Sequence, residues 1–229
     1  MKIRLSLTQK FLAPTLIVLA FVGVILNYQV NSILKREAIE GAKDIIADFI
    51  RIHSKRHVTS PSYFSLENPE KTNQIFSELF EDIKTYNIIR IKVWAKDGTI
   101  IFSDAKSIIG KNFADDEDFQ KSIRGEVAVD IQVPIKAENI SESGYEQLME
   151  MYVPIELKSG EGPVGVVETY YRLDSLNASI LKAQRGISLI ITLGFLLLAL
   201  ILWLLIKFIV IKPLKALETG IVGLKESKG

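Results

Sequence analysis

The sequence is short of the residues and charges on which several protein classes depend. It contains no cysteine, so it is not a disulfide-stapled miniprotein and it offers no cysteine nucleophile. Its 28 basic and 27 acidic side chains leave a formal net charge of +1, which excludes a protein that binds nucleic acid through bulk positive charge. With 48% hydrophobic residues, 14 glycines and 7 prolines among 229 residues, the chain is neither disordered nor collagen-like.

Catalytic motifs are missing as well. Neither an HExxH metal-binding sequence nor a GxSxG serine elbow occurs. Gly160, Gly162 and Gly165 have the spacing GxGxxG, but Pro163 lies among them and the stretch sits between two candidate strands, whereas a nucleotide-binding loop opens a helix. We therefore expect no enzymatic activity and no cofactor in this chain.

Two groups of residues have the composition of metal ligands. The acidic residues 115–118 could attract a cation, but consecutive side chains point in different directions around a helix, and the helix dipole favours carboxylates at a helix start. His53 and His57 share one face of a candidate helix, yet no third ligand is evident. We interpret the acidic run as a helix cap and the histidines as exposed polar residues, and we predict no metal site.

Two long uncharged stretches are more informative. No charged residue occurs from Phe11 to Leu34 or from Gly186 to Ile206. A helix rises about 1.5 Å per residue and the hydrocarbon core is about 30 Å thick, so roughly 20 apolar residues cross it. We predict transmembrane helices at residues 11–30 and 187–210. A signal peptide is the alternative for the first stretch, since basic residues precede it, but no small-residue cleavage site follows.

The basic residues beside these stretches predict an orientation. Residues 1–10 carry three basic and no acidic side chains, and residues 207–229 carry five basic and two acidic ones. Since positively charged flanks stay in the cytoplasm, both tails are expected there. Acidic residues outnumber basic ones in 31–186, which we expect to form one extracytoplasmic domain.

The periodicity of apolar residues in 31–186 predicts an α+β domain. Spacings of three and four continue the first apolar stretch as a long N-terminal helix and indicate helices at 72–87, at 116–124 and from 173 onward. Alternation predicts a five-stranded antiparallel sheet, with strands at residues 89–94, 99–103, 127–136, 148–157 and 164–172. The expected fold is thus this sheet with its long N-terminal helix, flanked by two transmembrane helices.

Candidate binding residues lie on the first of these strands. Arg90, Lys92 and Trp94 fall on one of its faces, and Arg124 ends the short helix. Basic groups beside an aromatic ring can hold a carboxylate, so we predict that these four residues bind a small organic acid. The alternative is that the alternation only reflects a half-exposed strand.

A coiled-coil pattern follows the second apolar stretch. After residues 211–213 come apolar residues at steps of three and four, as in a parallel coiled coil, namely Leu214, Leu217, Ile221 and Leu224. An amphipathic tail on the membrane surface is the alternative. A span followed by KPLKAL and this seam resembles the first helix of a HAMP domain, the dimeric four-helix bundle that transfers signals in bacterial receptors. The resemblance covers 211–229 and implies that Pro213 opens the helix, and the HAMP domain is expected to be truncated because its second helix would follow Gly229.

The extracytoplasmic part also resembles a known family. The stretch VWAKDGTIIFSDAKSIIGKNFADDEDFQKSIRGE, followed by EMYVPIEL and GPVGVVETYY, is similar to a single Cache domain, a PAS-like sensor. Members of this family sense small extracellular molecules in front of histidine kinases, diguanylate cyclases or chemotaxis transducers. Kinases of this type that sense citrate or dicarboxylates tend to have a histidine after the serine of the second strand, where this chain has Ser103-Asp104.

These resemblances imply a receptor of the bacterial inner membrane. The expected function is the sensory and transmembrane portion of a two-component sensor histidine kinase, which detects an organic acid or a similar molecule and has no nucleic-acid partner. We expect a parallel homodimer held through an apolar seam on the helix after residue 173, at Leu176, Ile180, Ala183 and Ile187. The alternatives are the input part of a diguanylate cyclase or chemotaxis transducer, and a stand-alone membrane scaffold without a small-molecule ligand.

Overall fold

The computed structural model describes residues 7–85, 87–132, 147–158 and 160–214. The chain divides into two compact units. Residues 37–179 form one unit, and residues 1–36 together with 180–229 form the other. Both boundaries fall inside long helices, α1 (Leu7–His57) and α4 (Asp174–Leu205).

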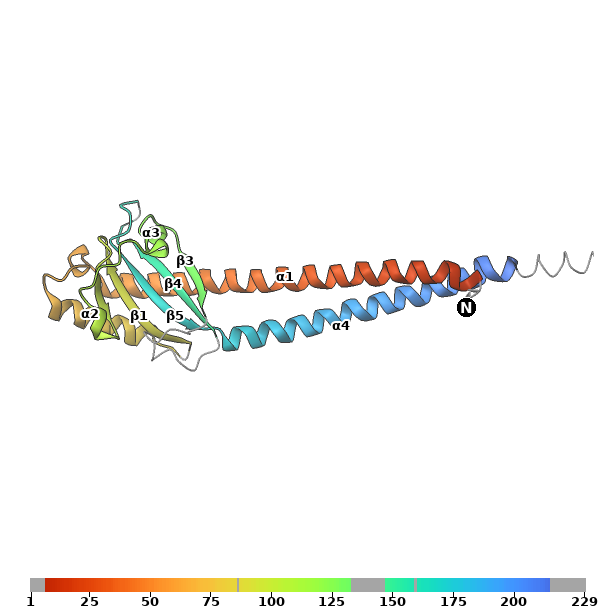
Figure 1. The fold of residues 1–229 in the computed structure, drawn as a ribbon. Helices are drawn as coiled ribbons and strands as arrows, with labels where there is room; N and C mark the ends of the chain where they lie inside the picture. The colour runs from red at the N-terminus through yellow and green to blue at the C-terminus, as the bar shows by residue number, and fades with distance from the viewer. Residues whose placement is uncertain (1–6, 86, 133–146, 159, 215–229) are drawn as a thin grey trace, which may run out of the picture. The chain divides into compact units, whose positions relative to one another are not determined.

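The unit of residues 37–179 is built on a five-stranded antiparallel sheet with the strand order β2-β1-β5-β4-β3 (Figure 1). The strands are β1 (Ile88–Ala95), β2 (Ile100–Ser103), β3 (Ala128–Gln132), β4 (Leu148–Ile155) and β5 (Gly165–Arg172). The predicted α+β class and the five strands are confirmed, with residues 133–136 of the predicted third strand lying outside the described residues. The last strand of the chain lies in the middle of the sheet, between β1 and β4.

Capping residues fix the starts of the shorter helices. In α2 (Pro69–Ile83), the Asn68 side chain accepts a hydrogen bond from the Lys71 N–H, and Pro69 occupies the first turn, where no N–H is needed. This cap starts the helix before residue 72, and the helix also ends before the predicted residue 87. Two short 3₁₀ helices complete the unit, η1 (Pro61–Tyr63) and η2 (Lys106–Ile108).

One face of the sheet packs against α1 and α2. Its core holds alternate residues of the central strands, because successive side chains of a strand point to opposite faces. The buried members include Ile46 and Ile50 of α1, Phe76, Leu79 and Ile83 of α2, Ile91 and Val93 of β1, Met149, Met151 and Val153 of β4, and Val167 of β5. All of these side chains are less than a tenth exposed.

The opposite face carries a smaller core beneath α3 (Glu117–Ser122). Phe119 of α3 is fully buried there against Trp94 of β1, Tyr152 of β4 and Val166 of β5. The Ser122 hydroxyl donates to the backbone carbonyl of Tyr152 and ties the end of the helix to the sheet. This face covers much less apolar surface than the other, which leaves room for polar side chains beside the helix.

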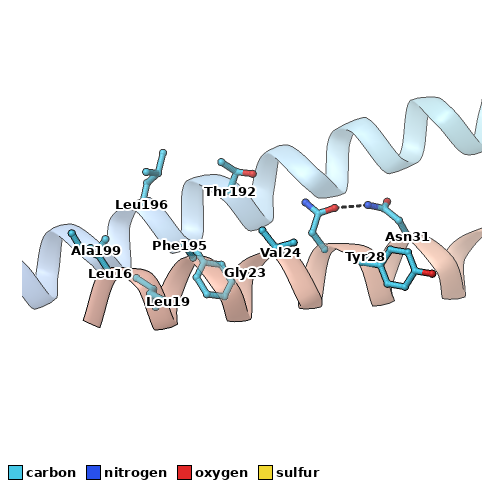
Figure 2. A pocket seen from close by; sticks show the side chains of 12 residues that line it. Leu16, Leu19, Gly23, Val24, Tyr28, Asn31, Thr192, Phe195, Leu196 and Ala199 are labelled. Carbon is cyan, nitrogen blue, oxygen red and sulfur yellow. Dashed lines mark hydrogen bonds between the residues drawn. The ribbon is translucent and has the colours of Figure 1, made fainter. Parts of the chain in front are cut away.

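The second unit contains two helical stretches that are long and apolar enough to cross a membrane, one in Leu12–His57 and one in Asp174–Leu214. Their apolar side chains are exposed, for example Phe21 at 66% and Leu196 at 61%, as expected for residues that face lipid. Between the helices lies an open groove lined by residues such as Leu16, Val24 and Leu196 (Figure 2).

Close contacts and polar groups join these two helices. The ring of Phe195 lies against Gly23, where an added Cβ would stand 3.3 Å from the ring (Figure 2). Asn31 donates to Asn27 and to the Ser188 hydroxyl, and the Ser188 hydroxyl donates to Asn27. A small residue and shared hydrogen bonds are common means of helix association in lipid.

Beyond Leu205 the helix widens into a π-helical stretch, Ile206–Ile211, in which the Lys212 N–H donates to the Lys207 carbonyl. The cause lies just downstream, because Pro213 has no N–H to donate and its ring would crowd the carbonyl four residues earlier in an α-helix. Pro213 and Leu214 continue as helix. The other residues of the predicted HAMP seam, Leu217, Ile221 and Leu224, lie outside the described residues.

Candidate ligand-binding site

A cavity of about 340 Å³ lies on the α3 side of the sheet. Strands β1, β4 and β5 form its floor, and the segment from β2 to α3 forms its wall. The lining residues are Arg90, Lys92, Trp94, Ile100, Ala105, Ser107, Ile108, Phe113, Asp116, Asp118, Glu150, Tyr152 and Tyr170. This volume is at the small end of the range typical of ligand-binding pockets, about 300–1,000 Å³.

The strand register arranges six polar side chains in two rows across the floor. Because β5 pairs with β1 on one side and with β4 on the other, each row holds one residue from each strand. The first row is Lys92, Glu168 and Tyr152, and the second row is Arg90, Tyr170 and Glu150. We call these six residues the polar floor.

Glu168 is the centre of the first row and is fully buried. Lys92 Nζ donates to its Oε1 at 2.6 Å, and the Trp94 indole N–H donates to its Oε2 at 2.7 Å. Burial alone would raise the pKa of Glu168, but the charge of Lys92 and the hydrogen bonds that the carboxylate accepts hold it below its ordinary value. Glu168 is therefore an anion, and the ammonium group of Lys92 balances its charge.

Glu150 lies diagonally across from Glu168 and behaves differently. Its Oε1 accepts hydrogen bonds from the hydroxyls of Tyr170 at 2.7 Å and Tyr152 at 3.1 Å, and Lys92 Nζ is 3.9 Å away. Burial and the neighbouring Glu168 carboxylate raise the pKa of Glu150 to about 8. The polar floor therefore contains one carboxyl that is fixed as an anion and one that gains or loses its proton close to neutral pH.

The two tyrosines keep their protons. Burial and the two carboxylates raise the pKa of both Tyr152 and Tyr170 above the ordinary value. Their hydroxyls thus act as donors to Glu150, while the Tyr170 oxygen accepts from Lys92 Nζ.

Arg90 occupies the edge of the floor next to β2. Its side chain is only 6% exposed, and its Nε is 3.1 Å from a carboxylate oxygen of Asp104, the residue that follows β2. Its guanidinium carbon lies 5.4 Å from the centre of the Tyr170 ring, and Lys92 Nζ lies 4.8 Å from the same centre. Both basic groups of the cavity therefore already have a carboxylate partner and an aromatic neighbour.

Aromatic rings form the end of the cavity near α3. Trp94 stacks on Phe119 with ring centres 5.1 Å apart, and it meets Phe113 and Tyr152 at 6.2 and 5.9 Å. Asp116, whose carboxylate accepts from the N–H groups of residues 118 and 119, borders the same space.

Three of the four residues predicted to bind a ligand are brought together. Arg90, Lys92 and Trp94 all line the cavity, as their common strand face predicted. Arg124 does not line it and lies exposed in the turn after α3. Ligand binding by these residues stays a prediction.

Four further residues complete the site and were not predicted from the sequence, namely Glu150, Tyr152, Glu168 and Tyr170. A signal for them was present, since β4 and β5 each contain the sequence Glu-x-Tyr and thus place both polar side chains on one face. The signal was ambiguous because the order of strands in the sheet decides whether two such faces meet.

The two groups considered as metal ligands have other partners. The acidic run is a helix cap as predicted, with Asp116 as the capping residue. The histidines are not exposed as predicted: His57 is 16% exposed and its Nε2 lies 2.7 Å from Asp82 of α2, while His53 lies 3.8 Å from the same carboxylate. The His57 hydrogen bond lowers the pKa of Asp82. Within the described residues, no group of three or more His, Asp or Glu side chains is placed to hold a metal ion.

No protein-family model matches the sequence, and no curated protein gives a significant match. Among solved structures, the sensor domain of DcuS from E. coli matches with a TM-score of 0.42 and 18% identity over 60% of this chain and 96% of that one. The sensor domain of the histidine kinase DctB from V. cholerae matches with a TM-score of 0.45 and 21% identity over 68% and 58%. An extracellular ligand binding receptor from Desulfohalobium retbaense matches with a TM-score of 0.39 and 16% identity over 66% and 26%. This chain is thus structurally similar to the sensor domains of DcuS and DctB.

Proposed function

We propose that this chain is the sensory and transmembrane portion of a bacterial receptor, of the kind that precedes a two-component histidine kinase. One observation carries the proposal: a polar cavity of ligand size lies in a domain that the chain enters through α1 and leaves through α4, and both helices contain stretches apolar enough to cross a membrane. The role of the chain is to receive and transfer a signal, and catalysis belongs to a separate output domain. The cavity binds a small extracytoplasmic molecule.

The proposed topology places residues 31–186 outside the inner membrane and both tails in the cytoplasm. The basic residues beside the apolar stretches support it. Because the chain has no cysteine, one introduced at Glu161, whose side chain is 63% exposed, can be labelled selectively. Glu161→Cys should react with a membrane-impermeant maleimide in intact spheroplasts, and Lys2→Cys should react only after lysis. The reverse pattern would overturn the topology.

The signal is proposed to leave the cavity through β5. This strand carries Glu168 and Tyr170 of the polar floor, and only Leu173, which is 1% exposed, separates its end from the start of α4. A ligand that prefers one position of β5 thereby biases the position of α4, in proportion to its difference in affinity for the two states. The signal would then reach Pro213 and Leu214 and the HAMP helix predicted beyond them.

The proposed receptor is a parallel homodimer. Within a single chain, Leu176 packs against the larger core and Ile180 is 6% exposed, so these two members of the predicted seam are already covered. Ala183 is exposed and remains a suitable reporter. Ala183→Cys in membranes is expected to form a symmetric disulfide crosslink more readily than Lys182→Cys, and no crosslink at any exposed position of residues 181–186 would overturn the homodimer.

A fusion of the whole chain to the transmitter part of a histidine kinase tests the signalling role. Tyr170→Phe removes one hydroxyl from the polar floor and keeps the ring, so it should change the rate of autophosphorylation in membrane vesicles. Tyr171→Phe removes the neighbouring hydroxyl, which faces the other side of the sheet and accepts from Asn87, and it should leave the rate unchanged. Equal rates for the wild type and both variants would contradict signal transfer from this cavity.

A further inference from the structure

The charges around the cavity identify the kind of ligand it suits. Five acidic or basic residues line it, and three of them are acidic: Asp116, Asp118 and Glu150, of which Glu150 is mostly protonated at pH 7. The two basic residues each contact a further carboxylate that lies behind the lining, Asp104 for Arg90 and Glu168 for Lys92. Asp118 is itself paired with Lys121, at 2.6 Å, whereas Asp116 forms no ion pair with the described residues. Counting all these partners, the described surroundings of the cavity hold four carboxylates besides Glu150 and three basic groups, so negative charge exceeds positive charge.

A ligand carboxylate would meet two obstacles here. It would have to displace Glu168 from Lys92, where the nitrogen and oxygen are 2.6 Å apart and the carboxylate is fully buried, or share Arg90 with Asp104. It would also lie in a small cavity beside other carboxylates, where like charges repel strongly because little water screens them.

A cation would be attracted by the same carboxylates that repel an anion. Asp116 borders the cavity close enough to Tyr152 for its charge to raise the pKa of that hydroxyl, so this carboxylate and the aromatic end share one space. Trp94, Phe113 and Tyr152 offer ring surfaces on which an ammonium group is stabilised. Glu150, across the floor, has Lys92 Nζ 3.9 Å away, and a bound ammonium group would add a second cationic partner when Glu150 ionises.

We infer that the cavity binds a small organic cation that carries an ammonium group, held between Asp116 and Glu150 and against the aromatic end. The inference rests on the proposed function, since it names the ligand class of the same sensory site. It differs from the organic acid predicted from the sequence, which was based on the basic residues of β1 without their carboxylate partners.

The inference has a pH signature. The pKa of Glu150 is raised to about 8, so at pH 7 most molecules carry a proton on this carboxyl. A cation beside it favours the ionised form and releases that proton. Affinity for an amine should therefore rise between about pH 6 and 8, and Glu150→Gln should remove this rise while it keeps the shape of the side chain.

The experiment uses the full chain in lipid nanodiscs and measures its melting temperature with increasing 1,4-diaminobutane, tetramethylammonium, glycine or succinate. The inference predicts saturable stabilisation by 1,4-diaminobutane, with no comparable effect of succinate. Asp116→Asn keeps a good helix cap and should weaken binding of the diamine about 10- to 100-fold, as expected for the loss of a charged hydrogen-bond partner. Asp115→Asn removes an exposed charge one residue away and should leave the affinity unchanged.

Three results would overturn the inference. Stabilisation by succinate that equals or exceeds that by the diamine would show an anion site and would leave the proposed sensory function intact. Equal loss of affinity in Asp115→Asn and Asp116→Asn would reduce the effect to general surface charge. If no compound stabilises the chain, the cation site is wrong, and the autophosphorylation of the Tyr170→Phe fusion then decides the proposed function on its own.

Discussion

Removing one partner of the ion pair between Lys92 and Glu168 should destabilise the chain strongly, and removing both partners should destabilise it less. The Glu168 side chain is fully buried and the Lys92 side chain is 16% exposed, and 2.6 Å separates their charged atoms. Glu168→Met leaves the Lys92 ammonium without its main partner and the Trp94 indole N–H without an acceptor. Loss of one partner of a buried pair costs about 3–5 kcal/mol of the free energy of unfolding.

The double variant separates the pair from the rest of the site. Lys92→Met alone leaves the Glu168 carboxylate without its cation and should cost a similar amount, about 3–5 kcal/mol. In Lys92→Met/Glu168→Met no unpaired charge of this pair remains, and the main loss is the orphaned Trp94 N–H, at about 1–3 kcal/mol. The double variant should therefore be more stable than either single variant.

The assay is chemical unfolding of the full chain in nanodiscs, followed by the fluorescence of Trp94 in a Trp203→Phe background. The exposed pair Lys158 and Glu161, 3.3 Å apart with side chains 77% and 63% exposed, is the matched control. Its Met substitutions should show coupling below about 1 kcal/mol. If the effects of Lys92→Met and Glu168→Met simply add, the buried pair does not act as described.

The remaining predictions concern pH, a turn and the apolar helices. The folded-state pKa of Glu150 lies above its unfolded value of 4.5, so between about pH 4.5 and 8 the folded state binds a proton that the unfolded state has lost. As the pH rises through this interval, the wild type should therefore lose stability relative to Glu150→Gln, which thermal melts at each pH would show. Gly98→Ala should destabilise the chain much more than Gly160→Ala. Both glycines have a positive φ, which costs about 1–2 kcal/mol for alanine. At Gly98 the new Cβ would also stand 2.6 Å from the Cα of Ala114, whereas at Gly160 no atom lies within 4 Å of it. Similar melting temperatures for these two variants would refute the close approach. Gly23→Val should weaken the contact between the apolar helices because even a Cβ at this position would stand 3.3 Å from the Phe195 ring, closer than ordinary van der Waals contact. Phe195→Ala should restore part of the melting temperature in the double variant.

Local patterns in the sequence predicted the elements because each pattern depends on neighbours along the chain. Alternation in β1, β4 and β5 reflects two faces of one sheet, and it located these three strands correctly. The start of α2 at Pro69 was missed because its signal is a cap, Asn68, and not an apolar period.

The candidate site was predicted only in part because it depends on which strands are neighbours. Arg90 and Lys92 were recognised as a basic pair, but their partners come from Asp104 and from β5, a strand more than 70 residues later in the chain. Spacing within a strand cannot show that Glu168 lies opposite Lys92. The position of Arg124 at the end of a predicted short helix likewise does not show which way its side chain faces, and the residue is exposed and does not line the cavity.

The π-helical stretch Ile206–Ile211 changes the angular position of the described helical residues that follow it, Lys212 to Leu214. A residue accommodated in a wider turn shifts the downstream side chains by about 100° around the axis, relative to an uninterrupted α-helix with 3.6 residues per turn. The face that Leu214 presents is therefore not the continuation of a face of α4. Tightening Ile206–Ile211 into an α-helix would therefore rotate Leu214 about the helix axis, so that a small change of pitch in this stretch becomes a change of orientation at its end.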